Sequence, residues 1–288
     1  MYRRVTSATV LALAILLAAS AKGDTIYSNL TPNNSIAMAS RTDGGGFQFE
    51  IETADDFLLP SPARITSASF VGLVVPGPGA LPSISQVSVE IYRVFPNDSN
   101  IVRNPNVPTR MNSPSDVALD TRESALGELA FSTSTLSNSF TANNSVQPGG
   151  IHPSPNQNTL GNGPLTGQEI QFNVTFATAF DLAPDHYFFV PQVTLTNGGQ
   201  FYWLSASRPI SGSGTSPFTP DLQVWTRDAF LDPDWLRVGT DIVGGSPAPT
   251  FNAAFSLNGA VVPEPSTLAF LISAALALFV LRKYRAAG

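Results

Sequence analysis

Short runs of alternating apolar and polar residues fill the middle of the chain, with turn residues between them. In residues 87–95, for example, Val87, Val89 and Ile91 occupy every second position. Because successive side chains of a strand point to opposite faces, this pattern predicts strands with one buried face. The expected strands are residues 47–53, 63–75, 87–95, 169–177, 187–196, 200–205, 221–227 and 250–257.

Helical periodicity is scarce between these strands. One short helix is expected within residues 115–129, where Asp116 could cap it and Leu119, Leu126 and Leu129 would share a face. Strands separated by turns rather than by helices favour an all-β domain over a parallel α/β fold. The pattern therefore predicts an antiparallel β-sandwich of jelly-roll type.

A long polar segment interrupts the strand pattern. Residues 97–167 are rich in Pro, Asn and Ser, and from residue 135 onward most are Asn, Ser, Thr, Gly or Pro. We interpret this segment as a surface excursion that joins two groups of strands within one domain, not as a second domain. A structureless loop of this length is usually either functional or disordered.

The N-terminus has the three parts of a secretory signal peptide. Arg3 and Arg4 are followed by an apolar run over residues 10–17, and Ala19-Ser20-Ala21 supplies small residues at a cleavage site. Residues 1–21 are therefore expected to engage the secretion machinery, with signal peptidase cutting after Ala21 and Gly23 as the competing boundary.

The C-terminus carries three signals in a fixed order within residues 261–288. The tripeptide Pro263-Glu264-Pro265 precedes an uncharged apolar run over residues 267–281, and a basic tail follows. The apolar run has 15 residues, whereas a transmembrane helix usually needs about 20. Snorkelling of basic side chains offsets such a shortfall, so we expect a membrane segment; a plain anchor or a buried helix is the alternative. The basic tail contains Arg282, Lys283 and Arg285.

This ordered tail resembles the PEP-CTERM sorting signal of Gram-negative bacteria. The resemblance covers about a tenth of the chain, and residues 54–70 also resemble a recurrent opening of exported β-sandwich domains that carry this tail. It implies that an exosortase-type transpeptidase processes the tail and that residues 22–260 form an exported domain. It further implies transient anchoring in the inner membrane, then the cell surface or an extracellular matrix, and a link to exopolysaccharide and biofilm.

Charge and cysteine content narrow the function. The chain has 15 basic and 21 acidic residues; without the five basic residues of the two ends, 10 basic residues remain against 21, a net charge of −11. Nucleic-acid binding depends on basic residues that neutralise phosphates, so it is not expected. The lack of cysteine excludes thiol catalysis and cysteine-ligated metal.

Catalytic motifs are weak. The two histidines are His152 and His186; Asp185 precedes His186, but neighbouring strand residues point apart, so a Ser/His/Asp triad is not expected. A glycoside hydrolase would need two facing carboxylates, and the sequence singles out no pair. We therefore expect a protein that is not an enzyme, with an exported carbohydrate-active hydrolase as the alternative.

Acidic residues suggest one metal site. Four aspartates fall within 14 residues, and Ca²⁺ prefers carboxylate and carbonyl oxygens, although the spacing is not that of an EF-hand. Aspartates also form turns, so a structural calcium is weighed against a plain turn, and no other cofactor is expected. Asp55 and Asp56 are expected to be solvated or paired with Arg64. The candidate calcium ligands are Asp228, Asp232, Asp234 and Asp241.

Aromatic residues are concentrated in the last third of the chain. Exposed aromatic rings stack on sugars, but aromatic residues also dominate protein cores. The candidate carbohydrate-binding residues, weighed against burial, are Tyr202, Trp203, Trp225 and Trp235. Together these features predict an exported, non-enzymatic envelope or matrix protein that binds exopolysaccharide, or alternatively a simply membrane-anchored periplasmic domain.

Overall fold

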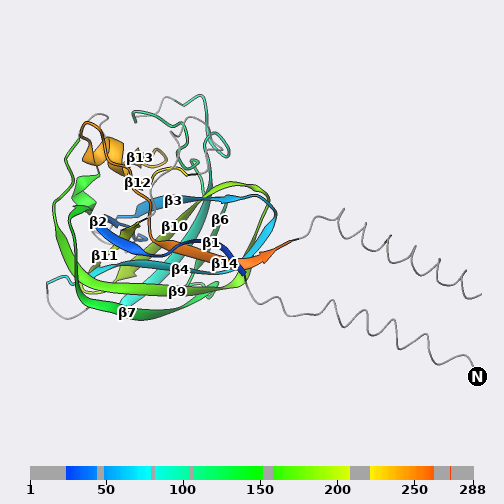
Figure 1. Cartoon of the computed structure of the whole chain (residues 1–288), viewed down its shortest axis with the longest axis horizontal. Coiled ribbons are helices and arrows are strands. Elements are labelled where there is room, and N and C mark those ends of the chain that lie inside the picture. The colour runs from blue at the N-terminus through cyan, green and yellow to red at the C-terminus, as the bar shows by residue number, and fades with distance from the viewer. Residues whose placement is uncertain are drawn as a thin grey trace, which may run out of the picture.

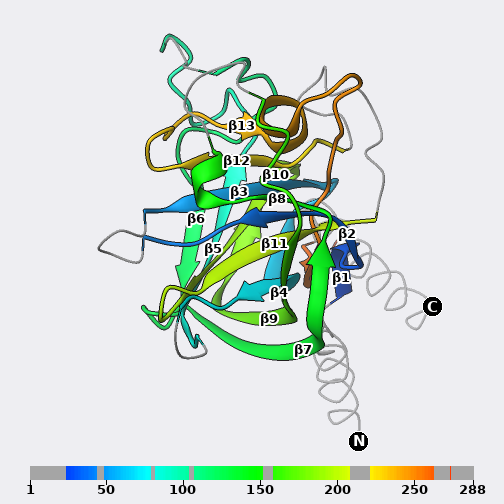
Figure 2. The ribbon, with the colours of Figure 1, turned by 90° about the vertical axis from the view of Figure 1, so that its left-hand side faces the viewer.

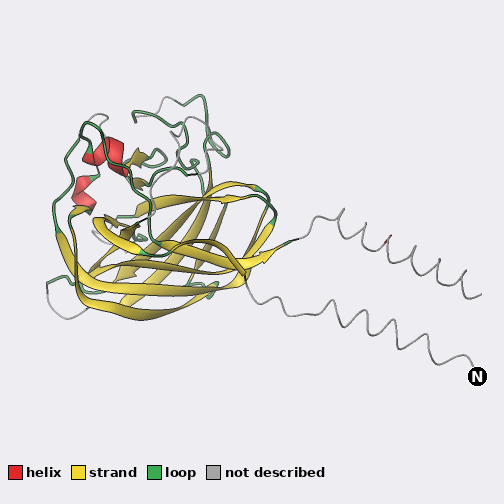
Figure 3. Ribbon diagram, in the orientation of Figure 1, coloured by secondary structure: helices red, strands yellow, loops and turns green. Residues whose placement is uncertain are grey.

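The protein is all-β, with two mainly antiparallel sheets that face each other (Figure 3). The structure is a computed structural model that describes residues 24–43, 49–78, 82–103, 107–151, 158–207 and 221–262, together with Ser273. The strands are β1 (Asp24–Asn29), β2 (Pro32–Ala39), β3 (Ile51–Leu59), β4 (Ala63–Val75), β5 (Ile84–Arg93), β6 (Asp120–Glu123), β7 (Leu129–Ala142), β8 (Asn144–Val146), β9 (Leu165–Leu182), β10 (Asp185–Leu195), β11 (Gln200–Ala206), β12 (Trp225–Asp228), β13 (Leu236–Arg237) and β14 (Phe255–Val261). Two short helical turns, η1 (Pro148–Gly150) and η2 (Val238–Val243), complete the described elements.

Strand β4 is the centre of the eight-stranded sheet. Along one edge it pairs with β9, which pairs in turn with β7. Along the other edge β14 pairs with the first part of β4 and β11 with the last part. β1 extends the sheet beyond β14, and β2 and β8 extend it beyond β11. Figure 1 shows β7, β9 and β4 side by side.

The second sheet has six strands in the order β13-β12-β3-β10-β5-β6. Strand β10 lies between β3 and β5, and its residues alternate between two buried faces. On the inner face, Phe189 of β10 stacks on Phe255 of β14 with ring centroids 5.0 Å apart. This contact joins the two sheets, and the same shared core contains Phe70 stacked on Phe172 at 4.9 Å.

A second, smaller core covers the outer face of the six-stranded sheet. Tyr92, Phe188 and Val190 point outward from the sheet, and Trp225 and Trp235 pack with them. β12 and β13 continue the sheet beyond β3, and in Figures 1 and 2 they and the adjacent loops lie at the end of the molecule away from the eight-stranded sheet. Most of β3 is consequently buried on both faces.

The expected helix within residues 115–129 is wrong. Residues 120–123 form strand β6, which pairs with β5. Asp116 caps no helix, because its Oδ2 accepts the Asn100 N–H at 2.9 Å and its Oδ1 binds Arg110. Leu126 is exposed, whereas Leu129 is buried at the start of β7. Pairing with an open strand edge has outweighed a weak helical pattern.

The polar segment is also more ordered than expected. It contains β6, β7 and β8, and β7 pairs with β9 over most of its length. Its Ser and Thr residues tolerate an extended strand, and Phe131 and Phe140 pack against the core. Residues 152–157 and 104–106 lie outside the described residues.

The first and last strands of the described domain are partners. β1 pairs antiparallel with β14, so that Asp24 lies opposite Gly259 (Figure 1). The N–H of Val262 still donates to the Pro62 carbonyl at 2.7 Å. The described domain therefore begins and ends at one place on the eight-stranded sheet.

Candidate functional site

A buried cluster of charged side chains lies beneath the smaller core. Glu52 of β3, Tyr92 of β5 and Arg227 of β12 each occupy outward positions and are almost inaccessible to solvent. β12 pairs directly with β3, which places Arg227 opposite Glu52. Glu90, two residues before Tyr92 on the same face of β5, completes the cluster and is half-buried.

Hydrogen bonds join the four side chains. The Arg227 guanidinium binds Glu52 through Nε and through Nη2, the latter at 3.1 Å from Oε1. The Tyr92 hydroxyl lies 2.5 Å from Oε1 of Glu52 and 2.9 Å from Oε2 of Glu90. Arg227 also lies over the Trp235 ring, 4.3 Å from its centroid. The cluster is thus covered by an aromatic residue.

Burial controls the protonation of this cluster. Burial, and then the charge of Glu52, raises the pKa of Glu90 to about 8. Burial and the same carboxylate raise the pKa of Tyr92. Burial alone would lower the pKa of Arg227, but Glu52 and Tyr92 raise it above its ordinary value. At neutral pH the cluster therefore holds a proton on Glu90 and a charged Arg227 paired with Glu52.

The geometry limits what these two carboxyl groups can do. A glycosidase leaves a space of about 5–10 Å between its carboxyl groups for a sugar or water. Here Glu52 and Glu90 lie within hydrogen-bonding distance of each other and the Tyr92 hydroxyl binds both, so the gap that a sugar or water needs is missing. The cluster holds strands β3, β5 and β12 together rather than presenting an acid and a base to a substrate.

A second buried pair joins His186 to Asp56. His186 Nε2 lies 2.6 Å from Asp56 Oδ2, and both side chains are sealed from solvent. Burial raises the pKa of Asp56 to about 6, although the His186 hydrogen bond opposes this shift. The other Asp56 oxygen accepts the Leu222 N–H at 2.8 Å. Asp55 and Asp56 are thus buried rather than solvated, and Arg64 pairs with Asp181 instead.

The four aromatic residues considered for sugar stacking lie in the core. Each is at most 3% exposed. Trp203 contacts Phe189 and Phe255 between the sheets, and Trp235 contacts Tyr92. Buried rings offer no face to a sugar in solvent, so the structure does not provide the expected aromatic platform. The four residues are Tyr202, Trp203, Trp225 and Trp235.

The four candidate calcium ligands do not converge. Asp228 Oδ1 accepts the N–H groups of Phe230 and Leu231 in a turn. The other three pair with arginines: Asp232 with Arg227, Asp234 with Arg103 and Arg110, and Asp241 with Arg237. Within the described part of the chain, no group of three or more His, Asp or Glu side chains could hold a metal ion.

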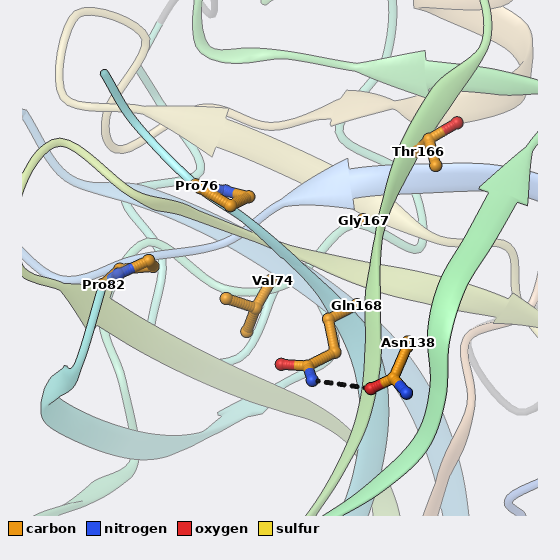
Figure 4. A pocket seen from close by; sticks show the side chains of 7 residues that line it. All are labelled: Val74, Pro76, Pro82, Asn138, Thr166, Gly167 and Gln168. Atoms are coloured by element: carbon orange, nitrogen blue, oxygen red, sulfur yellow. Dashed lines mark hydrogen bonds between the residues drawn. The ribbon is translucent and has the colours of Figure 1, made fainter. Parts of the chain in front are cut away.

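An open pocket of about 340 Å³ lies where β4 ends and β9 begins, beside β7 (Figure 4). Its lining is uncharged and combines apolar with amide side chains. Gln168 Nε2 donates to Asn138 Oδ1 at 3.3 Å across one wall. The lining residues are Val74, Pro76, Pro82, Asn138, Thr166, Gly167 and Gln168.

The sorting and processing residues lie outside the described residues. These are Ala19 and Ala21 at the signal cleavage site, Pro263, Glu264 and Pro265, and Arg282, Lys283 and Arg285. Among the described residues, no helix has the length and hydrophobicity needed to cross a membrane; the apolar run 267–281 is outside them apart from Ser273.

Comparison with known proteins adds no evidence on the role of these residues. No family model matches the chain, and the comparisons with curated proteins and with solved structures found no match.

Sequence reasoning missed both buried clusters. Glu52, Tyr92 and Arg227 come from three strands that are far apart in the sequence, and only the sheet register brings them together. The two-residue alternation of side chains along a strand could have placed Glu52 and Asp56 on one face. It could not have identified their partners on other strands. His186 was weighed against its neighbour Asp185, whereas its partner lies on the adjacent strand.

Proposed function

We propose that this chain is an exported, non-enzymatic protein of the envelope or extracellular matrix, sorted through its C-terminal tail. The observation that carries the proposal is the pairing of β1 with β14. Both proposed processing segments, residues 1–21 and 261–288, adjoin the same place on the domain. Cleavage after Ala21 and near residues 263–266 would leave the two paired strands intact at the edge of the sheet.

The assignment of a jelly-roll topology is part of this proposal. Two facing sheets in which the first strand pairs with the last support a jelly-roll β-sandwich, an architecture found in many binding and display domains. The bridged carboxyl groups of Glu52 and Glu90 favour a structural role over hydrolysis. The proposal therefore gives the exported domain a display or weak binding role.

In this proposal the C-terminal tail determines where the protein is sorted. We assign Pro263-Glu264-Pro265 as the sorting tripeptide, residues 267–281 as a membrane segment and the basic tail as its cytoplasmic end. The proposed partners are signal peptidase and the secretion machinery, an exosortase-type transpeptidase and the inner membrane, followed by exopolysaccharide at the cell surface or in the matrix of a Gram-negative host.

Peptide mass mapping of the mature C-terminus from native cells tests the proposal. A chain that ends near residues 263–266, without residues 267–288, is the expected result. In a variant with alanine at Pro263, Glu264 and Pro265, the terminus should remain at Gly288, whereas a variant at an exposed site outside the tail, Leu126→Ala, should be processed normally. An intact Gly288 in the wild-type protein would overturn sorting and leave a membrane-anchored periplasmic domain.

A further inference from the structure

We propose that the outer face of the eight-stranded sheet binds a neutral polysaccharide that lies flat across its strands; the biological setting of this inference rests on the proposed function. Five neighbouring strands, β7, β9, β4, β14 and β1, form this part of the sheet (Figure 1). The strand pairing lines up two rows of side chains across all five. The rows, which we call the hydroxyl–amide face, are Ser132, Asn173, Ser69, Ser256 and Ser28, and Ala130, Thr175, Ser67, Asn258 and Thr25.

The alternation of the strands places this face away from the core. Val174 lies between Asn173 and Thr175 on β9, and Leu257 lies between Ser256 and Asn258 on β14. Val174 and Leu257 belong to the shared core and are buried. Because successive side chains point to opposite sides of a sheet, the residues on either side of them point outward. Ser256 is nevertheless buried, so the accessible side chains of its row are those of Ser132, Asn173, Ser69 and Ser28.

The chemistry of the face is uniform. Nine of its ten residues are Ser, Thr or Asn, the tenth is Ala130, and none is charged. Ser69 Oγ donates to Asn173 Oδ1 at 2.9 Å, and Thr25 Oγ1 donates to Asn258 Oδ1 at 3.2 Å. Hydroxyl and amide groups both donate and accept hydrogen bonds, as sugar hydroxyl groups do.

The geometry of the face suits an extended polymer. Neighbouring strands are about 4.8 Å apart, and same-face residues along a strand are about 6.8 Å apart. The small side chains keep the surface shallow, so a chain of sugar rings could contact several strands at once. Many weak hydrogen bonds repeated along one polymer give binding by multivalency, without a deep pocket.

The negative net charge of the domain favours a neutral polymer over an acidic one. Without the basic residues of its two ends the chain carries −11, which repels acidic polysaccharides. The face also lacks the aromatic, methionine and arginine anchors of protein interfaces. Solubility alone would be served by lysine and glutamate, which this face does not contain.

Co-sedimentation of the full-length protein with insoluble glycans tests the inference. The protein is purified in a polyoxyethylene detergent, which carries no sugar, and mixed with cellulose, with an insoluble β-1,3-glucan and with calcium-crosslinked alginate. We expect it to bind at least one of the two neutral glycans and to bind alginate more weakly.

Matched variants locate the surface. Ser132 and Thr175 are exposed on the face, so S132E/T175E adds bulk and charge there and should weaken binding at least about tenfold, the loss of one or two hydrogen bonds. The conservative S132T/T175S should retain binding. L58E/S85E places the same charges at exposed positions on the six-stranded sheet and should bind like the wild type.

Three results would overturn the inference: no sedimentation with either neutral glycan, stronger binding to alginate, or an S132E/T175E variant that binds like the wild type. If N138A/Q168A abolishes binding while S132E/T175E does not, the site is the uncharged pocket instead. Failure of binding with normal tail processing would remove this inference and leave the sorting proposal standing. Binding with an unprocessed tail would do the reverse.

Discussion

The Tyr92 hydroxyl donates a hydrogen bond to Glu52 at 2.5 Å, although the two residues lie on different strands of the six-stranded sheet. Arg227 binds both side chains. These contacts link β3, β5 and β12 beneath the Trp235 ring. A charge at this depth is stabilising only while its partners remain, because removal of one partner leaves the other buried and unpaired.

Replacement of Arg227 should therefore be strongly destabilising. Arg227→Met leaves the Glu52 carboxylate buried without its counter-ion, and we expect the free energy of unfolding to fall by about 3–5 kcal/mol. Urea denaturation measures the loss. Arg64→Met is the matched control, because its pair with Asp181 is exposed and should contribute about 0–1 kcal/mol. Similar losses in the two variants would contradict the structural role of the buried cluster.

The raised pKa of Glu90 predicts a pH dependence of stability. The folded chain keeps this proton up to about pH 8, whereas the unfolded chain releases it above its ordinary pKa of 4.5. Between these values the unfolded state binds fewer protons, so stability should fall as the pH rises from about 4.5 to about 8. Denaturation in a pH series measures this slope.

Glu90→Gln removes the titration and keeps a hydrogen-bonding side chain. We expect its stability to change less than that of the wild type between about pH 6 and pH 8. Asp24→Asn, at an exposed position of β1, should keep the wild-type slope. An unchanged slope in the Gln variant would assign the pH dependence to other buried acids, such as Asp55, whose pKa burial also raises.

Gly72 marks a close approach between β4 and β11. A Cβ at this position would lie 2.5 Å from the Tyr202 carbonyl oxygen and would overlap the Phe201 ring. Gly72→Ala should therefore cost about 1–3 kcal/mol through overpacking. For a domain of this size each kcal/mol lowers Tm by about 2–4 °C, which thermal unfolding would detect.

Gly149→Ala is the control for this substitution. No atom lies within 4 Å of a Cβ built at Gly149, so the change should leave Tm nearly unchanged or raise it slightly. An equal loss in both variants would show that backbone conformation, not crowding, limits these positions.

Calcium should not stabilise the fold. The carboxylates of Asp234 and Asp241 are bound by arginine side chains, and a cation would have to displace these partners. We expect Tm to be the same in EDTA and in millimolar Ca²⁺. A rise of several degrees with Ca²⁺, lost in Asp228→Asn, would restore the calcium site.

Sequence patterns predicted strands where one face is apolar. The expected strand at residues 63–75 coincides with β4, because buried residues alternate with more exposed ones over its first part and Pro76 follows it. β7 was missed because its Ser and Thr residues carry no apolar period; its extended form depends on the edge of β9. A local pattern indicates which residues are buried, whereas the pairing of a strand edge depends on the arrangement of the whole sheet.

The candidate site was less predictable than the fold. Trp203, Trp225 and Trp235 were recognised as notable, but the sequence does not say which face of a strand is covered. A second core on the outer face of the six-stranded sheet buries Trp225 and Trp235. The ion pair of Glu52 with Arg227 joins residues 175 positions apart, a distance over which no local pattern carries information.

The pairing of β1 with β14 also orders the folding of the chain. During synthesis or translocation from the N-terminus, Asp24–Asn29 emerges first, but its partner Phe255–Val261 emerges last. The first strand therefore remains without its β14 partner until nearly the whole domain has emerged. Contacts of such high sequence separation slow folding, and the eight-stranded sheet can gain its β1 edge only after β14 has emerged.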